Sequence, residues 1–420
     1  MIGPTGRRVV VTGLGAVTPL GSDAATFWSR LVAGESGVRT TASFDPSRVT
    51  SRIAGEVQGF DASHVLDRKE LRRNDRTTQL ALVATREAMI DAGLPERLEG
   101  EDAEATGVLI GSGLGGLGTL IDQIATWATR GPDRVSPFFI PMAIGNMAAG
   151  QAAISFGAQG PSFAPTSACA SGGHSIGEAA ETIRRGDAEM MLAGGSEAVV
   201  YETTVAAFSA MRALSTRNDD PAGASRPFDQ GRDGFVIAEG SAILVVEELE
   251  HARRRGAHIR AELVGYGATA DAYHITLPAP GGGGATRAGR RSMAKAGIEP
   301  SEVDLVCAHA TSTPEGDGAE LQSIRTLLGD SAPRVSITAT KGSIGHTLGA
   351  AGAIAAVVAL LAMRDGRIPP TLNLTDPDPL IGDLDCTPLR ARRRDVRVAM
   401  VNAFGFGGQN SSLIFRRWDA

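Results

Sequence analysis

Short apolar runs alternate along this chain with stretches of helical periodicity. Runs rich in β-branched and aliphatic residues lie at 8–13, 107–110, 189–192 and 242–246. Between the first two runs, residues 76–92 repeat apolar side chains at steps of three and four. Strands that alternate with helices predict an α/β fold built from stacked layers.

Two glycine-rich segments are similar to each other, SGGHSIG at 171–177 and SIGHTLG at 343–349. We interpret each as a turn that leads into an apolar helix. The similarity has two explanations, chance between glycine-rich turns or duplication of half the chain. The residues by themselves leave both explanations open.

Duplication would place a boundary near Arg255. A charged segment of helical pattern covers 248–257, and a new apolar run begins at Ala261. No low-complexity linker lies between them, which favours one fused unit over two independent domains. We therefore expect two halves, residues 1–255 and 256–420.

The composition excludes several classes of protein. Hydrophobic residues make up 42% and charged residues 21% of the 420, and 53 are glycine, which is typical of a soluble globular α/β protein. The net charge of -6 is mild and the basic residues are scattered, so we expect no nucleic-acid partner. The longest apolar stretch, 350–363, is too short to span a bilayer, so we expect a buried core helix and no membrane contact.

Cysteine use favours a reducing compartment. Three cysteines in a chain of this length provide no disulfide framework, and the N-terminus has no signal pattern, so we expect a cytoplasmic protein. Of the three, Cys169 is set among small residues, in TSACASGG at 166–173, directly before a helical stretch. Backbone N–H groups and the dipole at a helix N-terminus favour thiolate over thiol, and the thiolate is the nucleophile. A buried structural cysteine is the competing interpretation.

Two histidines follow strand-like runs within small and hydroxyl-bearing residues. They are His309 in AHATSTP at 308–314 and His346 in KGSIGHTLG at 341–349. Reacting residues often occupy such loops, although a lone histidine of this kind is more often structural. Together with Cys169 the pair indicates an acyl-transfer site. The spacings match none of the short zinc patterns, so a metal site is disfavoured.

The glycine-rich segment FGFGGQN at 404–410 has two interpretations. It forms either a turn before a terminal strand or a mobile loop whose backbone N–H groups face a developing oxyanion. The glycines at 13–15 and 111–116 fit a dinucleotide fingerprint poorly, and no suitable acidic residue follows them. We therefore expect no nicotinamide cofactor.

Together these segments resemble the β-ketoacyl-acyl carrier protein synthases of the thiolase superfamily, specifically the elongating enzymes of type II fatty acid synthesis. The resemblance runs through nearly the whole chain and has the same order of motifs. Beyond the three candidate catalytic stretches, it includes GPDRVSPFF at 131–139, LSTRND at 214–219, SRPFD at 225–229, RDGF at 232–235 and IPPT at 368–371. It implies an α/β fold of the thiolase-like kind, a duplicated five-layered sandwich.

The resemblance also implies roles for individual residues. Cys169, in the first half, would receive the acyl chain, and the N–H groups of Cys169 and Phe406 would form the oxyanion hole. His309 and His346, in the second half, would complete the triad by donating to the malonyl thioester carbonyl. Paired N–H donors in a dry site lower the barrier to decarboxylation without a metal or redox cofactor.

Further residues match the family's substrate-binding positions. Thr311 and Thr313 correspond to the hydroxyls that hold the phosphopantetheine arm. Leu114 and Phe208 correspond to residues that shape the acyl pocket, and Phe404 would line it as well. Segment 271–278 resembles a second gating loop beside Phe406. For all of these residues, core packing and surface turns are the competing interpretation.

One position departs from the family's pattern. Lys341 corresponds to a charged residue that lines the site, but Ala355 stands where the family usually has the glutamate that pairs with it. An unpaired buried ammonium is costly, so we expect Lys341 to be solvated, paired with Glu320, or shifted toward the neutral form. A milder departure is Ala310, where glycine is typical.

The carrier protein implied by the resemblance is acidic, so local cations would have to receive it. Four residues fit this role, and the first three lie in DRKELRRND at 67–75, which resembles the family's docking segment: Lys69, Arg72, Arg73 and Arg212. A solvated helix face is the competing interpretation.

The catalytic set does not choose between primary fatty acid elongation and a ketosynthase subunit of a type II polyketide pathway. The composition, rich in Arg, Ala and Gly, and the glutamate missing at Ala355 favour a specialised pathway slightly. A homodimer is expected in the first case, and a heterodimer with a chain-length factor in the second. A non-catalytic partner subunit would not need Cys169, His309 and His346 together. Thiolase-type chemistry would need a second cysteine in the glycine-rich C-terminal loop, and Cys386 lies outside it.

Overall fold

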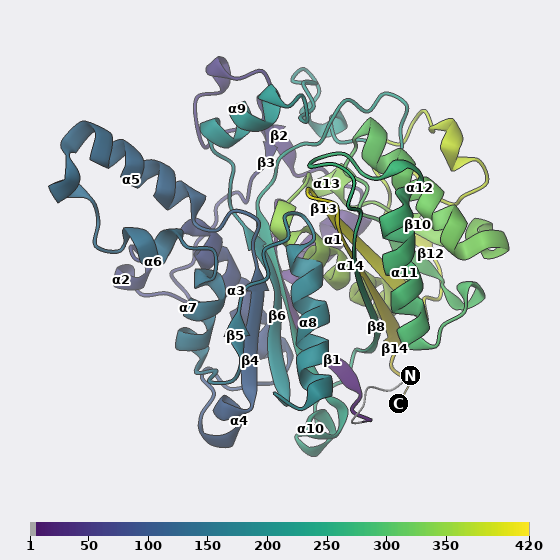
Figure 1. The fold of residues 1–420 in the computed structure, drawn as a ribbon, viewed down its shortest axis with the longest axis horizontal. Helices are drawn as coiled ribbons and strands as arrows, with labels where there is room; N and C mark the ends of the chain where they lie inside the picture. The colour runs from purple at the N-terminus through teal and green to yellow at the C-terminus, as the bar shows by residue number, and fades with distance from the viewer. Residues whose placement is uncertain (1–5, 420) are drawn as a thin grey trace.

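A ten-stranded sheet forms the centre of the fold, which a computed structural model describes for residues 6–419. Its strand order is β10, β9, β13, β14, β8, β1, β7, β6, β4 and β5 (Figure 1). The strands are β1 (Val9–Val17), β4 (Thr106–Gly111), β5 (Ser162–Phe163), β6 (Met190–Glu197), β7 (Gly240–Glu248), β8 (Ala261–Ala270), β9 (Leu305–Cys307), β10 (Ser336–Thr338), β13 (Val398–Gly405) and β14 (Gln409–Arg417).

The sheet consists of two five-stranded halves with the same pattern of pairing. In the first half, β1 pairs antiparallel with β7 and β7 with β6, whereas β6–β4 and β4–β5 are parallel. In the second half, β8–β14 and β14–β13 are antiparallel, whereas β13–β9 and β9–β10 are parallel. A short antiparallel pairing of β1 with β8 joins the halves. The repeated topology confirms a duplicated fold.

Helices complete a sandwich of five layers. Two helices, α8 and α14, contact each other and strands of both halves, so they form the middle layer (Figure 1). Other helices cover the outer faces, α3 and α7 on the first half and α11, with α12 beside it, on the second. The helices are α3 (Arg76–Asp91), α7 (Met147–Phe156), α8 (Ser171–Arg185), α11 (Gly283–Ala296), α12 (Pro314–Leu328) and α14 (Ala351–Asp365). The thiolase-like layering is therefore confirmed.

The middle layer depends on close approach of its two helices. A Cβ atom at Gly352 of α14 would lie 2.8 Å from the backbone nitrogen of Gly173 in α8. Helix α14 is buried from Ala351 to Met363, as expected for a core helix. The stretch Leu348–Asp365 is long and apolar enough to cross a membrane by length and composition, but 89% of it is buried inside the protein.

The boundaries predicted from sequence need small corrections. The predicted helix at 76–92 is α3, and the charged segment before Arg255 contains the shorter helix α10 (Leu249–Arg254). The segment 171–177 lies within α8 and is no turn, because α8 already begins at Ser171. The related segment 343–349 does form the turns that precede α14.

The remaining elements lie around this sandwich. Helix α5 projects away from the body at the left of Figure 1. The elements are α1 (Ala24–Val32), α2 (Arg68–Leu71), α4 (Gly100–Glu104), α5 (Leu117–Arg130), α6 (Phe139–Ala143), α9 (Glu202–Ala210) and α13 (Lys341–Ile344), with two small ribbons, β2 (Val38–Thr40) with β3 (Ile53–Gly55) and β11 (Arg367–Ile368) with β12 (Arg392–Arg393).

Candidate active site

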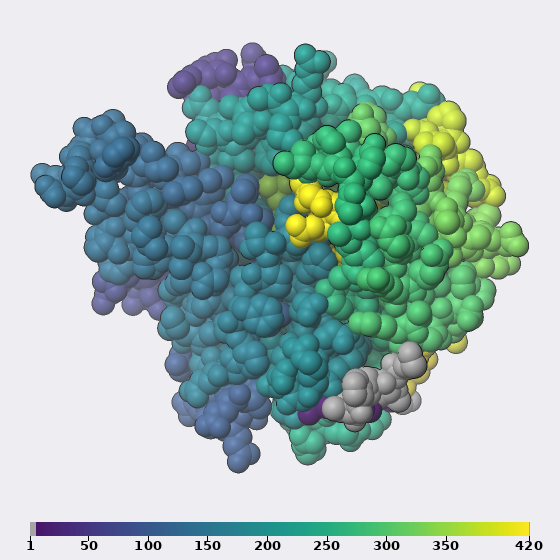
Figure 2. All heavy atoms as spheres, in the orientation of Figure 1, coloured from purple at the N-terminus to yellow at the C-terminus, as the bar shows by residue number. Residues whose placement is uncertain are grey.

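A cavity of about 550 Å³ brings both halves of the chain together. On the face shown in Figure 2, yellow atoms of the C-terminal segment lie in a hollow between teal and green parts of the chain. Residues predicted from the sequence line much of the cavity: Leu114, Cys169, Phe208, Arg212, His309, Thr311, Thr313, His346, Phe404 and Phe406.

The turn that carries Cys169 lies directly before α8. Ala168 has a φ of 49°, a left-handed conformation that non-glycine residues seldom adopt. The Ser171 hydroxyl stabilises this turn, because it donates to the Ala168 carbonyl at 2.7 Å and accepts from the Ser167 N–H at 2.9 Å. The strained turn places the thiol at the wall of the cavity.

The thiol of Cys169 is protonated at neutral pH. Burial raises its pKa to about 12, although the charge of Lys341 and the backbone N–H groups of Phe406 and Cys169 act in the opposite direction. The expectation of a thiolate stabilised by the helix N-terminus is therefore wrong for the resting site, because desolvation outweighs the local dipoles. The N–H groups of Phe406 and Cys169 nonetheless act on the same site, where an oxyanion hole would need two donors.

The rings of His309 and His346 lie edge to face, with centroids 5.4 Å apart. Burial lowers the pKa of both rings well below the usual value, and the nearby Lys341 charge lowers it further, so both are neutral. Within residues 6–419, neither Nδ1 atom has a hydrogen-bond partner. Buried polar atoms without partners are unusual in folded proteins and are typical of sites that bind a ligand.

Glu320 fixes the loop that carries His309. Its carboxylate accepts from the backbone N–H of His309 at 2.9 Å and of Ala310 at 2.7 Å. Asn402 donates to the same carboxylate at 3.2 Å. Glu320 therefore holds the backbone of the His309 loop and forms no direct ion pair with Lys341. Its charge still raises the pKa of Lys341 from a distance.

Lys341 lies behind His309 and is absent from the residues that line the cavity. Its ammonium donates to the carbonyl oxygen of His309. With 5% of its surface exposed it is not solvated, contrary to one of the three expectations. Burial lowers the pKa of Lys341 to about 8, partly opposed by the charge of Glu320, so the shift toward neutral is the expectation that holds.

The glycine-rich segment 404–410 is the turn between β13 and β14. Gly407 and Gly408 both have positive φ, at 83° and 71°, which a tight turn around Phe406 requires. The segment 271–278 is bonded to this turn, since the Gly407 N–H donates to Ile275 and the Asp271 N–H donates to Gly408, each at 2.7 Å. The turn and the segment therefore cover one side of the cavity together.

Aromatic side chains form a connected wall of the cavity. The Phe208 ring lies 6.5 Å from Phe406 and 5.2 Å from Phe235, and Phe235 lies 5.4 Å from His346. Phe404 lies 5.5 Å from His309 on the other side. An apolar wall beside two neutral imidazoles suits an acyl chain better than a charged ligand.

The two threonines have structural partners as well as access to the cavity. Their hydroxyl oxygens, Thr311 Oγ1 and Thr313 Oγ1, lie 3.1 Å apart. Thr313 also accepts from the Gly316 N–H at 3.3 Å and so caps α12. Their positions are therefore compatible with both predictions from the sequence, contact with a bound arm and a purely structural role.

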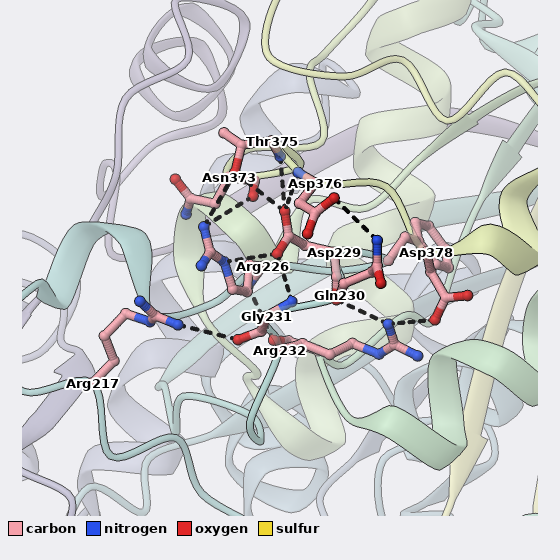
Figure 3. Close-up of polar contacts among 12 residues, drawn as sticks. Arg217, Arg226, Asp229, Gln230, Gly231, Arg232, Asn373, Thr375, Asp376 and Asp378 are labelled. Atoms are coloured by element: carbon pink, nitrogen blue, oxygen red, sulfur yellow. Dashed lines mark hydrogen bonds and ion pairs between the residues drawn. The ribbon is translucent and has the colours of Figure 1, made fainter.

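A buried arginine holds the threonine loop in place. Arg232 donates to the carbonyl oxygens of Thr313 at 3.2 Å and Pro314 at 3.0 Å, and it forms an ion pair with Asp378 at 2.7 Å. Figure 3 shows Arg232 beside Asp229, whose carboxylate accepts from backbone N–H groups at residues 231, 375 and 376. These bonds hold Arg232, which follows SRPFD, against Thr313 and Pro314 in the cavity wall.

The predicted docking cations fall into two places. Lys69, Arg72 and Arg73 line a separate surface depression together with Arg68 and Phe138. The Arg73 guanidinium stacks over the Phe138 ring, 4.3 Å from its centroid. Arg212 lies apart from them, at the cavity itself, and has a φ of 55°.

The sequence interpretation did not assign several residues that shape the site. Glu197 lines the cavity at the end of β6, and Phe235 joins Phe208 to His346. A signal for Glu197 was present, since a glutamate ending a fully buried strand is rare unless its carboxylate is bonded. Phe235 has no comparable signal, because an aromatic residue in a loop is usually core.

Comparison with known proteins agrees with this geometry. Residues 6–252 match the family model described as "Beta-ketoacyl synthase, N-terminal domain", and residues 260–375 match "Beta-ketoacyl synthase, C-terminal domain". The chain belongs to the β-ketoacyl synthase family. It is 47% identical over 414 residues to 3-oxoacyl-[acyl-carrier-protein] synthase 2 of Staphylococcus aureus strain N315, with 99% of each chain covered.

Solved β-ketoacyl synthases have the same fold. A β-ketoacyl synthase from Burkholderia phymatum STM815 superposes with a TM-score of 0.92 at 38% identity, over 98% of this chain and 100% of that one. A type II polyketide ketosynthase, solved in complex with its acyl carrier protein, superposes with a TM-score of 0.89 at 35% identity and the same coverage.

Proposed function

We propose that Cys169 is the nucleophile of a decarboxylative condensation that extends an acyl chain by a malonyl unit. The observation that carries the proposal is the single cavity into which Cys169, His309, His346 and Phe406 converge from both halves. The names of the family and of the relative from S. aureus support a condensing acyltransferase that acts on carrier-bound substrates.

In the first step the Cys169 sulfur attacks the carbonyl carbon of an acyl group carried on a thioester. The N–H groups of Cys169 and Phe406 bind the oxyanion of the tetrahedral intermediate. The carbon-sulfur bond to the carrier then breaks, and the carrier thiol leaves with the proton that Cys169 gives up. The step is therefore neutral in protons and electrons.

In the second step a malonyl thioester loses carbon dioxide. The electron pair of the broken bond forms an enolate, whose oxygen accepts hydrogen bonds from the neutral rings of His309 and His346. The enolate carbon attacks the acyl-Cys169 carbonyl, and the sulfur leaves as a thiolate that takes one proton from solvent. Because both neutral rings can donate and no net electrons are exchanged, the reaction needs neither a metal nor a redox cofactor.

We propose that an acidic acyl carrier protein docks on the cations beside the cavity. Lys69, Arg72 and Arg73 form the main patch with Arg68, and Arg212 guides the arm at the entrance. Thr311 and Thr313 then bind the phosphopantetheine arm. A related ketosynthase solved with its acyl carrier protein supports this partner.

We also propose that the protein acts as a dimer. Strand β5 ends the sheet with two exposed residues, so its edge can pair with another strand. Apolar side chains are also unusually exposed on α5, with Ile124 at 51% and Trp127 at 58%. A homodimer is the default, and a chain-length factor is the alternative second subunit.

The division at residues 255 and 256 is likewise a proposal. The repeated strand order supports it, because β7 closes the first pattern and β8 opens the second. The separate matches to residues 6–252 and 260–375 support the same division. A cytoplasmic location is proposed from the free thiols of Cys169, Cys307 and Cys386.

Fatty acid elongation is the pathway we favour. The 47% identity to the synthase from S. aureus exceeds the 35% identity to the polyketide ketosynthase. A polyketide subunit is the second candidate because a type II polyketide ketosynthase superposes on this chain with a TM-score of 0.89. Retention of Cys169 with both histidines in one cavity argues against a non-catalytic subunit, and Cys386 lines no part of that cavity, which argues against a thiolase.

The decisive experiment incubates the purified protein with acyl carrier protein bearing saturated chains of several lengths, then adds malonyl carrier. We expect an acyl adduct on the Cys169 peptide by mass spectrometry, its loss in Cys169→Ser, and a β-ketoacyl product after malonyl carrier is added. Active carriers without an adduct on Cys169 would refute the proposal. Activity that appears only with a co-expressed second subunit would favour the polyketide pathway.

A further inference from the structure

Glu197 is a buried carboxylate at the wall of the cavity, and the steps above assign it no role. It is the last residue of β6, and its side chain has no exposed surface. Burial raises the pKa of Glu197, although four hydrogen bonds to the carboxylate act in the opposite direction. A buried acid with this many partners has a specific task in the fold or in the reaction.

The four donors come from two separate segments. The Ser112 hydroxyl at 2.7 Å and the Leu114 N–H at 3.1 Å donate to Oε1. The Gly113 N–H at 2.7 Å and the Gly349 N–H at 3.0 Å donate to Oε2. Glu197 therefore bonds the segment 112–114 to the turn that follows His346.

Both segments line the cavity that contains Cys169. Leu114 and Gly113 belong to the first, and Leu348, next to Gly349, belongs to the second. Leu348 has a φ of 45°, so its backbone is held in a left-handed conformation. The side chains that an acyl group would meet are thus positioned by bonds to one carboxylate.

The packing around this junction leaves no room for adjustment. A Cβ atom at Gly349 would lie 2.6 Å from Glu197 Oε2 and 2.6 Å from the Gly113 nitrogen. A Cβ atom at Gly195, two residues before Glu197, would lie 2.5 Å from the Gly349 carbonyl oxygen. Movement of either segment would therefore break hydrogen bonds to the carboxylate and could not be absorbed by its neighbours.

We propose that Glu197 is a positioning residue that sets the acyl-chain selectivity of Cys169, by holding Leu114 and Leu348 at fixed places in the cavity wall. This inference rests on the proposed function of Cys169 as the acyl acceptor. In the proposed reaction Glu197 touches no reacting atom.

The chemistry of the junction selects a carboxylate. Three of the four partners are backbone N–H groups, which can only donate. A glutamine would direct its own NH₂ group at one of the donor pairs and so release either Leu114 or the Gly113 and Gly349 pair. Glu197→Gln should therefore loosen one wall while it nearly preserves the volume of the side chain.

The test compares Glu197→Gln with wild type on acyl carriers of increasing chain length. The ratio of kcat/KM between the best and the worst chain measures selectivity. We expect this ratio to fall by about tenfold, because a single methylene contact in a pocket contributes that much discrimination. The midpoint pH for alkylation of Cys169 should also fall, since the Glu197 charge is one of the groups that raise the pKa of that thiol.

Glu56 offers a matched control. Its buried carboxylate accepts from the Thr41 hydroxyl, from the N–H groups of Ala42 and Ser43 and from the Gln58 amide, but it does not line the cavity. Glu56→Gln should cost similar stability and leave both the selectivity ratio and the alkylation midpoint unchanged. Should Glu197→Gln fail to fold, Ser112→Ala removes one bond to Oε1 and should lower the ratio in the same direction.

The outcomes separate this inference from the proposed function. Wild-type protein that forms no adduct on Cys169 refutes the proposed function itself. With the adduct present, an unchanged selectivity ratio in a folded Glu197 variant overturns the inference, as does an equal loss for all chain lengths. A change of the same size in Glu56→Gln would assign the effect to stability and overturn it as well.

Discussion

Lys341→Met should make the protein more stable at neutral pH. The Lys341 ammonium is buried, and it donates a hydrogen bond to the carbonyl oxygen of His309. Ala355, where the sequence resemblance implied a glutamate partner, offers no carboxylate. Methionine has a similar length and no charge, so it fills the same space without the desolvation cost.

The magnitude follows from the pKa of Lys341, which burial lowers from 10.5 to about 8. Between these two values the unfolded chain binds more protons than the folded one, so the free energy of unfolding rises with pH across this window. A difference of about 2.5 pKa units, at 1.36 kcal/mol per unit, makes the charge cost about 3 kcal/mol at pH 7. Loss of the hydrogen bond to His309 offsets about 1 kcal/mol of the stability that the variant gains by removing this charge.

The assay is urea unfolding of wild type and variant at several pH values. We expect Lys341→Met to be more stable by about 2 kcal/mol at pH 7 and the difference to approach zero near pH 9.5. Lys69→Met serves as the control, because this exposed lysine should change stability by less than about 0.5 kcal/mol at every pH. A variant less stable at pH 7, or a difference that does not depend on pH, would refute the reasoning.

Three further perturbations test other parts of the site. His346→Ala should slow condensation by about 10²–10³-fold and leave acylation of Cys169 measurable by mass spectrometry, since it removes one enolate donor; equal loss of both steps would contradict that role. Charge reversal by Lys69→Glu with Arg72→Glu should raise KM for carrier-borne substrates and spare small thioesters, and equal effects on both would argue against docking. Arg232→Met should lower the free energy of unfolding by about 3–5 kcal/mol in urea titrations, because the fully buried Asp317 and the half-buried Asp378 lose their cationic partner; an unchanged midpoint would show that these ion pairs contribute nothing.

The layered fold could be predicted because its signals are local. Alternating apolar runs and helical periodicity identified β1, β4, β6, β7 and α3 with errors of a few residues. The apolar stretch at 350–363 was recognisable as core, since α14 packs between both halves and is apolar on all sides. Duplication was visible only as a similarity of two glycine-rich segments and needed the strand pairing to decide it.

The electrostatics of the site could not be predicted, because burial depends on segments far apart in the chain. The sequence places Cys169 at a helix N-terminus, which favours a thiolate, yet the cavity closes around it and raises its pKa to about 12. Likewise, the sequence suggested Glu320 as an ion-pair partner for Lys341, but the Glu320 carboxylate accepts from the N–H groups of His309 and Ala310. The expectation for Cys169 neglected desolvation, whereas the hydrogen bonds of Glu320 depend on a tertiary contact between α12 and the His309 loop.

The duplicated topology explains why one cavity contains groups from both halves. Cys169 lies directly before α8, and His346 lies in the turns before α14, so the two middle-layer helices present their N-terminal ends to the same space. Gly172 and Gly195 approach the Gly349 carbonyl because no Cβ atoms intervene, which draws the two ends together. Glu197 accepts hydrogen bonds from Leu114 in the first half and from Gly349 in the second, so this part of the cavity wall depends on contacts that neither half makes alone. A change that separates the two halves should therefore abolish catalysis before it unfolds either half of the sheet.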